Sequence, residues 1–198
     1  MFMKELSEWS QDRKIWLTSD THFNHKNIIA YESRPFSSVP EMNYALIANW
    51  NKVVAPEDAV IHLGDFALGS ANDLDRLVGS LNGHKFLILG NHDRASRHRF
   101  LAAGFEDVQQ SCLITLYDTL IFLSHRPKYH ADNCLHLYGH VHTKGLQTYP
   151  TIAKNGACLC TERWNYTPIE LSTVIQLCQE SDIFAPGLMP DYIPPVYK

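Results

Sequence analysis

The chain has no long hydrophobic segment. None of the apolar runs in its 198 residues approaches the roughly 18 residues that a membrane-crossing helix needs. Residues 1–14 mix charged residues with single apolar ones, unlike the apolar stretch of a secretory signal peptide. We therefore expect a protein with no membrane segment or membrane partner, located in the cytoplasm.

Positive charge is also scarce. Lysine and arginine number 17 against 21 aspartate and glutamate residues, which gives a formal net charge of −4. The one dense basic cluster, residues 94–99, is best explained as the solvated face of a helix. Because nucleic-acid binding depends on many cations that neutralise phosphates, long DNA or RNA is not an expected partner.

Cysteine is limited to five residues, an odd number that does not suit a disulfide framework. Most of them lie in apolar stretches, so we expect reduced, buried thiols. Cys158 and Cys160 are separated by one residue, whereas redox and zinc-ribbon motifs use two. A thiolate metal site is therefore not expected.

The remaining composition, with 45% hydrophobic and 19% charged residues, is ordinary for a globular protein. The length suits a single domain over residues 1–198. Prolines exclude a regular helix over residues 181–198, so we expect a proline-rich C-terminal tail there. Neither the role of this tail nor the oligomeric state follows from the sequence.

Hydrophobic spacing predicts several elements. Met42, Leu46 and Trp50 share one face of a helix predicted over residues 39–54. Further helices are predicted over 71–78, 93–103 and 169–179, two strands over 108–117 and 119–124, and a long polar connection over 23–38.

The chain is rich in histidine, with 11 residues, and many of these lie in polar motifs that follow short apolar runs. Such runs, bounded by Gly, Asn and Asp, are typical of buried strands. The motifs are Asp20-Thr21-His22, Gly64-Asp65, Gly90-Asn91-His92-Asp93, His125 and Gly139-His140-Val141-His142. Carboxylate, imidazole and amide groups without thiolate have the composition of a two-metal hydrolytic site.

This ordered series resembles the calcineurin-like metallophosphoesterase superfamily, in particular its small single-domain bacterial and phage-type members. The resemblance covers the chain from about Asp20 to His142. It implies an α/β fold, a four-layer α/β/β/α sandwich with two mixed β-sheets and the metal site at the C-terminal ends of the strands. Propensity alone supports only an α/β protein with a mixed sheet.

The resemblance also implies a ligand set for two divalent metal ions. It assigns Asp20, His22 and His142 to the first metal and Asn91, His125 and His140 to the second, with Asp65 bridging both. Manganese is the first expectation for these mixed nitrogen and oxygen ligands, and iron, zinc, cobalt or nickel are also compatible.

The catalytic residues implied by the resemblance are His92 and Asp93. A metal-bridging hydroxide would attack phosphorus in line, and His92 would protonate the leaving oxygen. Asp93 would orient the ring of His92, although a role as N-cap of the following helix suits Asp93 equally well.

Five residues near the motifs are weaker candidates for substrate contacts, and each also suits a surface or loop role: Arg126, Arg94, Arg34, Asn24 and His25. Arg34 and Phe36 lie in the long connection over residues 23–38, which is long enough to form a wall above the metals. His62 precedes Asp65 by three residues, and we interpret it as a packed histidine behind the site.

Three functions remain open. The first is a metal-dependent phosphoric ester hydrolase, a phosphodiesterase or phosphatase that acts on small phosphodiesters or nucleotide-like esters. The alternatives are a nuclease acting on DNA or RNA and a non-catalytic metal-bearing scaffold of the same fold. Protein Ser/Thr phosphatases extend the second motif to Gly-Asp-x-x-Asp-Arg-Gly, whereas this chain reads Gly-Asp-Phe-Ala-Leu-Gly over residues 64–69, which counts against that class.

Overall fold

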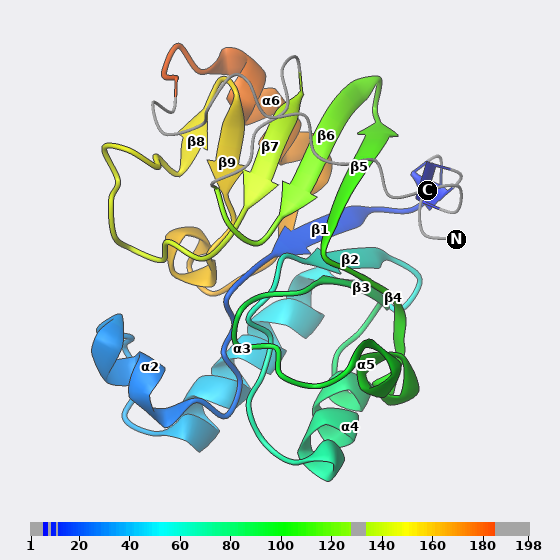
Figure 1. Cartoon of the computed structure of the whole chain (residues 1–198), viewed down its shortest axis with the longest axis vertical. Helices are drawn as coiled ribbons and strands as arrows, with labels where there is room; N and C mark the ends of the chain where they lie inside the picture. Colours follow the sequence, from blue (N-terminus) through cyan, green and yellow to red (C-terminus); the bar gives the residue numbers. More distant parts are fainter. Residues whose placement is uncertain (1–5, 8, 11, 128–133, 185–198) are drawn as a thin grey trace.

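Two five-stranded β-sheets form the centre of the computed structural model, which describes residues 6–7, 9–10, 12–127 and 134–184 (Figure 1). Most of the predicted proline-rich tail lies outside the described residues. Both sheets are mixed, as expected, and helices accompany them. No helix among the described residues is long and apolar enough to cross a membrane.

The first sheet has the strand order β10-β1-β2-β3-β4. Its four neighbouring strands β1 to β4 run parallel, while β10 pairs antiparallel with β1 at the edge. Because parallel strands end at the same edge, the connections that follow them lie together. The bounds are Ile15–Thr18 for β1, Ala59–His62 for β2, His84–Ile88 for β3, Phe105–Gln109 for β4 and Ile169–Glu170 for β10.

The second sheet has the order β5-β6-β7-β9-β8. The hairpin β5–β6 is antiparallel, β7 runs parallel to β6 and β9, and β8 closes the edge antiparallel to β9. The strands are Ser111–Leu116 for β5, Thr119–Ser124 for β6, Leu135–Tyr138 for β7, Ile152–Ala153 for β8 and Gly156–Cys158 for β9. The predicted strands over 108–117 and 119–124 correspond to β5 and β6, with the end of β4 at the start of the first.

The helices α3 (Val39–Val53), α4 (Ala71–Ser80) and α5 (Arg97–Ala103) follow strands or connections of the first sheet. The side chain of Ser38 caps α3, and Ser70 and Asp73 form a capping box on α4. The predicted helix over 93–103 begins later, at Arg97, because Ser96 caps it. The predicted polar connection over 23–38 contains the short helix α2 (Lys26–Tyr31).

The core has two main parts, which follow from the alternation of side chains along the strands. Leu17 of β1 packs with residues of the second sheet, such as Leu123, in the cluster between the two sheets. Its neighbour Trp16 points the other way and packs with Leu46 and Trp50 of α3.

The helix α6 (Leu171–Glu180) contacts β1 and β10 as well as β8 and β9, so it joins the two sheets at one side. The described residues thus show two mixed sheets, with α3, α4 and α5 packed on the first sheet and α6 against strands of both.

Candidate metal centre

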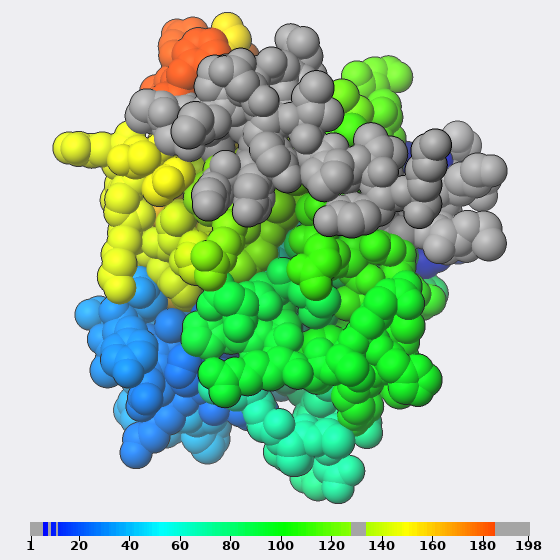
Figure 2. Space-filling model, in the orientation of Figure 1, coloured from blue at the N-terminus to red at the C-terminus, as the bar shows by residue number. Residues whose placement is uncertain are grey.

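The polar motifs predicted from the sequence meet where strands of both sheets end. Three of them follow β1, β2 and β3 of the first sheet, and the other two follow β6 and β7 of the second. In the space-filling view the connections after β1, β3 and β7, drawn in blue, green and yellow, meet on one face of the molecule (Figure 2). The carboxyl ends of parallel strands are where α/β proteins place their ligands.

Asp20, His22 and His142 form the first donor cluster. Their ligand atoms all lie within 4.8 Å of one another. Asp20 and His22 are buried, and His142 is partly exposed. The Nε2 atom of His142 lies 3.4 Å from Oδ1 of Asp20. The cluster contains the three residues that the resemblance assigns to the first metal.

Asp65, His125 and His140 form the second donor cluster, again with ligand atoms within 4.8 Å of one another. Oδ1 of Asn91 adjoins it, 3.2 Å from Nε2 of His125. Oδ2 of Asp65 lies 3.4 Å from Nε2 of His125 and 3.5 Å from Nε2 of His22. The carboxylate of Asp65, a member of the second cluster, therefore also lies next to His22 of the first, as a bridging ligand would.

The donor set fits divalent cations. Oδ1 of Asp20 and Nε2 of His22 are buried and have no hydrogen-bond partner among the described residues, a state that costs about 1–3 kcal/mol per group. Burial lowers the pKa of His22 to about 2, so the ring is neutral and offers a lone pair. A cation bound to a carboxylate and neutral imidazoles would satisfy both atoms.

Most of these residues have a left-handed backbone. The φ angles are 56° at Asp20, 50° at His22, 56° at Asp65, 72° at His140 and 46° at His142. Non-glycine residues seldom adopt this conformation, and Asp and His are among those that tolerate it best. Such residues cost about 1–3 kcal/mol each and cluster at functional sites. The surrounding fold therefore holds these residues in a backbone conformation that they would seldom adopt by themselves.

Two glycines allow the backbone to come close to the carboxylates. A Cβ atom at Gly90 would lie 2.2 Å from Oδ1 of Asp65, and one at Gly139 would lie 2.3 Å from Oδ2 of Asp20. Both distances are far below van der Waals contact. Any side chain at either position would displace a candidate ligand.

His92 lies beside the first cluster. Its ring centroid is 5.3 Å from that of His22, and its backbone N–H donates to Oδ1 of Asp65 over 2.7 Å. The ring is half-buried, so a substrate can reach it. This position suits the proton donor that the resemblance implies.

Asp93 has a different role from either of those predicted. Its carboxylate accepts hydrogen bonds from the backbone N–H groups of Asp65, Phe66 and Gly90. Among the described residues no hydrogen bond joins it to the ring of His92. Nor does it cap the following helix, which starts at Arg97. Asp93 instead ties the connection after β2 to the connection after β3.

Arg34 and Asn24 do not line the substrate side of the site, contrary to the prediction. Arg34 is buried and donates to the carbonyl oxygens of Asp20 and Thr21. The amide of Asn24 donates to the carbonyl of Leu68 and accepts from Asn43. Both side chains hold loops behind the donor clusters, because their polar atoms are occupied by backbone and neighbouring side chains.

The other three candidate substrate residues lie near the donor clusters. Nδ1 of His25 lies 3.3 Å from Nδ1 of His22. Arg126 is exposed, and its guanidinium lies 3.3 Å from Oδ1 of Asn91. Arg94 is exposed and lines a cavity together with His92.

Glu162 is a site residue that the sequence analysis missed. It lies in the 3₁₀ helix Thr161–Trp164, and its Oε1 is 3.0 Å from Nδ1 of His142 and 2.6 Å from the guanidinium of Arg34. Burial opposes its ionisation, but the hydrogen bond from His142 and the charge of Arg34 lower the pKa of Glu162 to about 2. An acceptor at Nδ1 leaves Nε2 of His142 free for a cation. No motif marks this glutamate.

The predictions for His62 and for the thiols are confirmed. His62 is buried and contacts Thr21 Oγ1 and the backbone N–H of Gly64, so it supports the loops behind the site. All five cysteines are buried, and none of them forms a disulfide with another described residue. Cys160 accepts from the backbone N–H of His142 and lies beside Asp20, but no donor cluster among the described residues includes a thiol.

Comparisons with known proteins agree with this geometry. The calcineurin-like phosphoesterase family model matches residues 13–119. The protein MJ1445 of Methanocaldococcus jannaschii is 36% identical over 179 residues, which cover 86% of this chain and 94% of that protein. The Gene 66 protein of Mycobacterium phage D29 is 41% identical over 83 residues, 40% of each chain. The crystal structure of AQ665 from Aquifex aeolicus has a TM-score of 0.66 and 28% identity, and the match covers 84% of this chain and all of that one.

The mixed α/β fold and its two donor clusters define a protein with candidate metal-binding sites. The family model matches more than half of the chain, and the alignment with the archaeal relative covers most of it. The chain therefore belongs to the calcineurin-like phosphoesterase family. Membership implies metal-dependent hydrolysis of phosphate esters.

Glu162→Gln tests the support of His142. The amide keeps the size of the side chain but removes the charge that holds the imidazole tautomer, so we expect Mn²⁺ affinity to fall about 10–100-fold, measured by isothermal titration calorimetry. Glu106→Gln is the matched control, since Glu106 pairs with His84 at the surface. Unchanged Mn²⁺ affinity in a folded Glu162→Gln variant would contradict the role of Glu162.

Proposed function

We propose that this protein is a dinuclear-metal phosphoesterase that hydrolyses small phosphodiesters or nucleotide-like phosphate esters. The observation that carries the proposal is the carboxylate of Asp65, which lies next to imidazoles of both donor clusters, with His92 beside the first. Family membership supports the reaction class. Nitrogen and oxygen donors suit Mn²⁺ first, with iron, zinc, cobalt or nickel as alternatives.

Two divalent cations, when bound, supply Lewis acidity for the phosphoryl oxygens and lower the pKa of water toward about 7. The chain would provide the ligands: the first cluster would hold one cation, and the second cluster with Asn91 would hold the other. Asp65 would bridge the two cations, and two hydrogen bonds fix its position: its Oδ1 accepts from the backbone N–H of His92, and its own N–H donates to Asp93.

His92 acts on the leaving group. A half-buried imidazole near the first cluster is within reach of an ester oxygen and can donate a proton as the P–O bond breaks. Such general acid help contributes about 10²–10⁴-fold in rate. His25 lies against His22 of the first cluster, and Arg126 lies against Asn91 beside the second. Arg126, as an exposed guanidinium, suits a non-reacting phosphoryl oxygen.

Metal removal is the first test. Protein treated with a chelator should lose hydrolysis of bis(4-nitrophenyl) phosphate and regain it with Mn²⁺, because the ligand set holds the groups that activate water. Release of 4-nitrophenolate measures the rate. Hydrolysis that persists after complete metal removal would refute a metal-dependent mechanism.

A second test distinguishes the proposed role of His92 in proton donation from that of Asp65 in metal binding. His92→Ala should retain metal yet lower turnover about 10²–10⁴-fold for a methyl ester, whose alkoxide needs protonation. The loss should shrink for a 4-nitrophenyl ester, and Asp65→Ala should lose metal. Metal content by plasma mass spectrometry and rates on both esters are compared, with His98→Ala on the exposed face of α5 as control. Equal metal loss in both variants would contradict this division of roles.

The substrate class is tested by comparing specificity constants at physiological salt. Cyclic nucleotides and aryl diesters should be preferred over single- and double-stranded oligonucleotides, because the chain has a net charge of −4 and nucleic-acid affinity depends on cationic contacts with phosphates. A clear preference for oligonucleotides would favour a nuclease. Metal binding with no hydrolysis of any ester would favour a scaffold.

A further inference from the structure

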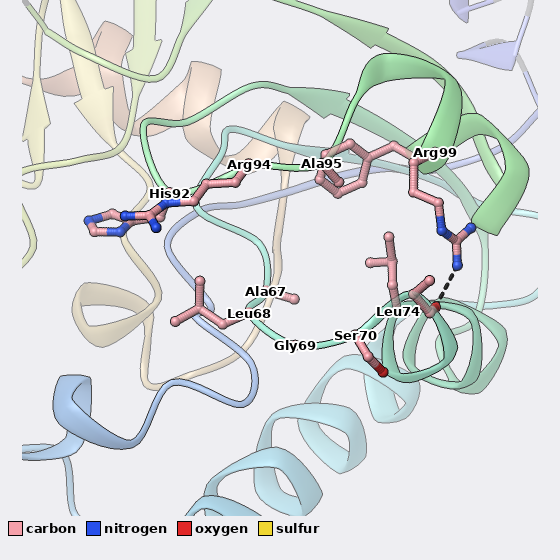
Figure 3. Close-up of a pocket in the computed structure, with 11 residues that line it drawn as sticks. Ala67, Leu68, Gly69, Ser70, Leu74, His92, Arg94, Ala95 and Arg99 are labelled. Carbon is pink, nitrogen blue, oxygen red and sulfur yellow. Dashed lines mark hydrogen bonds between the residues drawn. The ribbon is translucent and has the colours of Figure 1, made fainter.

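A cavity of about 320 Å³ opens directly beside His92. It lies between two segments of the first sheet: the connection after β2 with the first turn of α4, and the connection after β3 with the start of α5. Figure 3 shows Arg94, Ala95 and Arg99 along one wall, Leu68, Gly69 and Ser70 along the other, and His92 at one end. The cavity is therefore continuous with the candidate catalytic position.

Apolar groups form most of the lining. Leu74 of α4 and Phe100 of α5 are buried side chains that line it, and the small Ala71 and Ala95 come from the two different segments. Such a surface favours an apolar ring over a string of hydrated phosphates, because burial stabilises apolar area by about 25 cal/mol per Å².

The two arginines of the lining differ in what they can offer. The guanidinium of Arg99 is occupied by the Ala71 carbonyl and by Asp75, 2.6 Å away. The guanidinium of Arg94 is exposed and makes no hydrogen bond or ion pair with the described residues. Guanidinium planes stack on aromatic faces, so Arg94 is placed to cover a ring that enters next to His92.

The chemistry of the proposed reaction determines which part of a substrate enters. A general acid must come within about 2.6–3.2 Å of the leaving oxygen, so the group attached to that oxygen begins at His92. The cavity that His92 lines is the adjoining space. From this, and resting on the proposed function, we infer that the cavity is the subsite for the leaving group and takes a flat, largely apolar ring of aryl or nucleobase type.

The size supports one ring system. Small-molecule sites span about 300–1,000 Å³, and this cavity is at the lower end of that range. A bicyclic ring gains contact with both walls, whereas a single ring leaves part of the space unfilled. Leaving-group size should therefore affect substrate binding.

The experiment compares phenyl methyl phosphate with 2-naphthyl methyl phosphate in the Mn²⁺-loaded full chain. The two phenols have similar acidity, so chemical reactivity is nearly matched. We expect kcat/KM to be about tenfold higher for the naphthyl ester, mainly through KM. Ala71→Leu and Ala95→Leu fill the cavity from the two different segments, and each should bring the ratio of the two specificity constants close to one. Ala102→Leu, on the exposed side of α5, is the matched control and should keep the wild-type ratio.

A second measurement does not depend on turnover of the larger ester. Free 2-naphthol should inhibit hydrolysis of phenyl methyl phosphate competitively in the wild type and less in both filled variants. Metal-dependent hydrolysis of both esters with equal kcat/KM, or a naphthyl preference that survives both fillings, would overturn the subsite and leave the proposed function standing. Absence of metal-dependent hydrolysis of either ester would overturn both.

Discussion

One buried carboxylate organises the centre of this protein. Asp65 lies between imidazoles of the two donor clusters, and its second oxygen accepts a hydrogen bond from the backbone of His92. A buried carboxylate must be satisfied on all sides, since an unpaired charge in the interior is very costly. The connections after β1, β3 and β6 therefore have to converge on the end of β2. The parallel arrangement of the first sheet brings the connections after β1 and β3 there, and the connection after β6 reaches the same place from the second sheet.

Behind the first cluster, a second set of buried side chains holds the candidate ligands in place. The guanidinium of Arg34 holds the carbonyls of Asp20 and Thr21 and pairs with Glu162, which in turn holds His142. Loss of one partner of such a buried pair typically costs about 3–5 kcal/mol, because the other charge is left uncompensated. The position of the ligands thus depends on residues that never touch a substrate.

Much of the site was predictable because its residues follow strands directly. Apolar runs locate the strands, and the polar residue types after them indicate their chemistry; the two donor clusters contain six of the predicted ligands, Asp20, His22, His142, Asp65, His125 and His140. Support residues escaped prediction for a physical reason. Arg34 and Glu162 are separated by 128 residues and meet only in the folded chain, so no local spacing marks them. The start of α5 was misplaced because Asp93 and Ser96 are both good caps, and tertiary hydrogen bonds occupy Asp93.

The donor clusters also cross the boundary between the two sheets. His142 follows a strand of the second sheet but joins Asp20 and His22, and Asp65 follows a strand of the first sheet but joins His125 and His140. Neither sheet could bind a cation in this way alone. A bound ion would therefore act as a cross-link between distant parts of one polypeptide, closing a loop of more than a hundred residues between Asp20 and His142. The unfolded chain would lose entropy from that closure, much as it does from a disulfide. Metal binding at this centre would therefore stabilise the tertiary structure in addition to any role in catalysis.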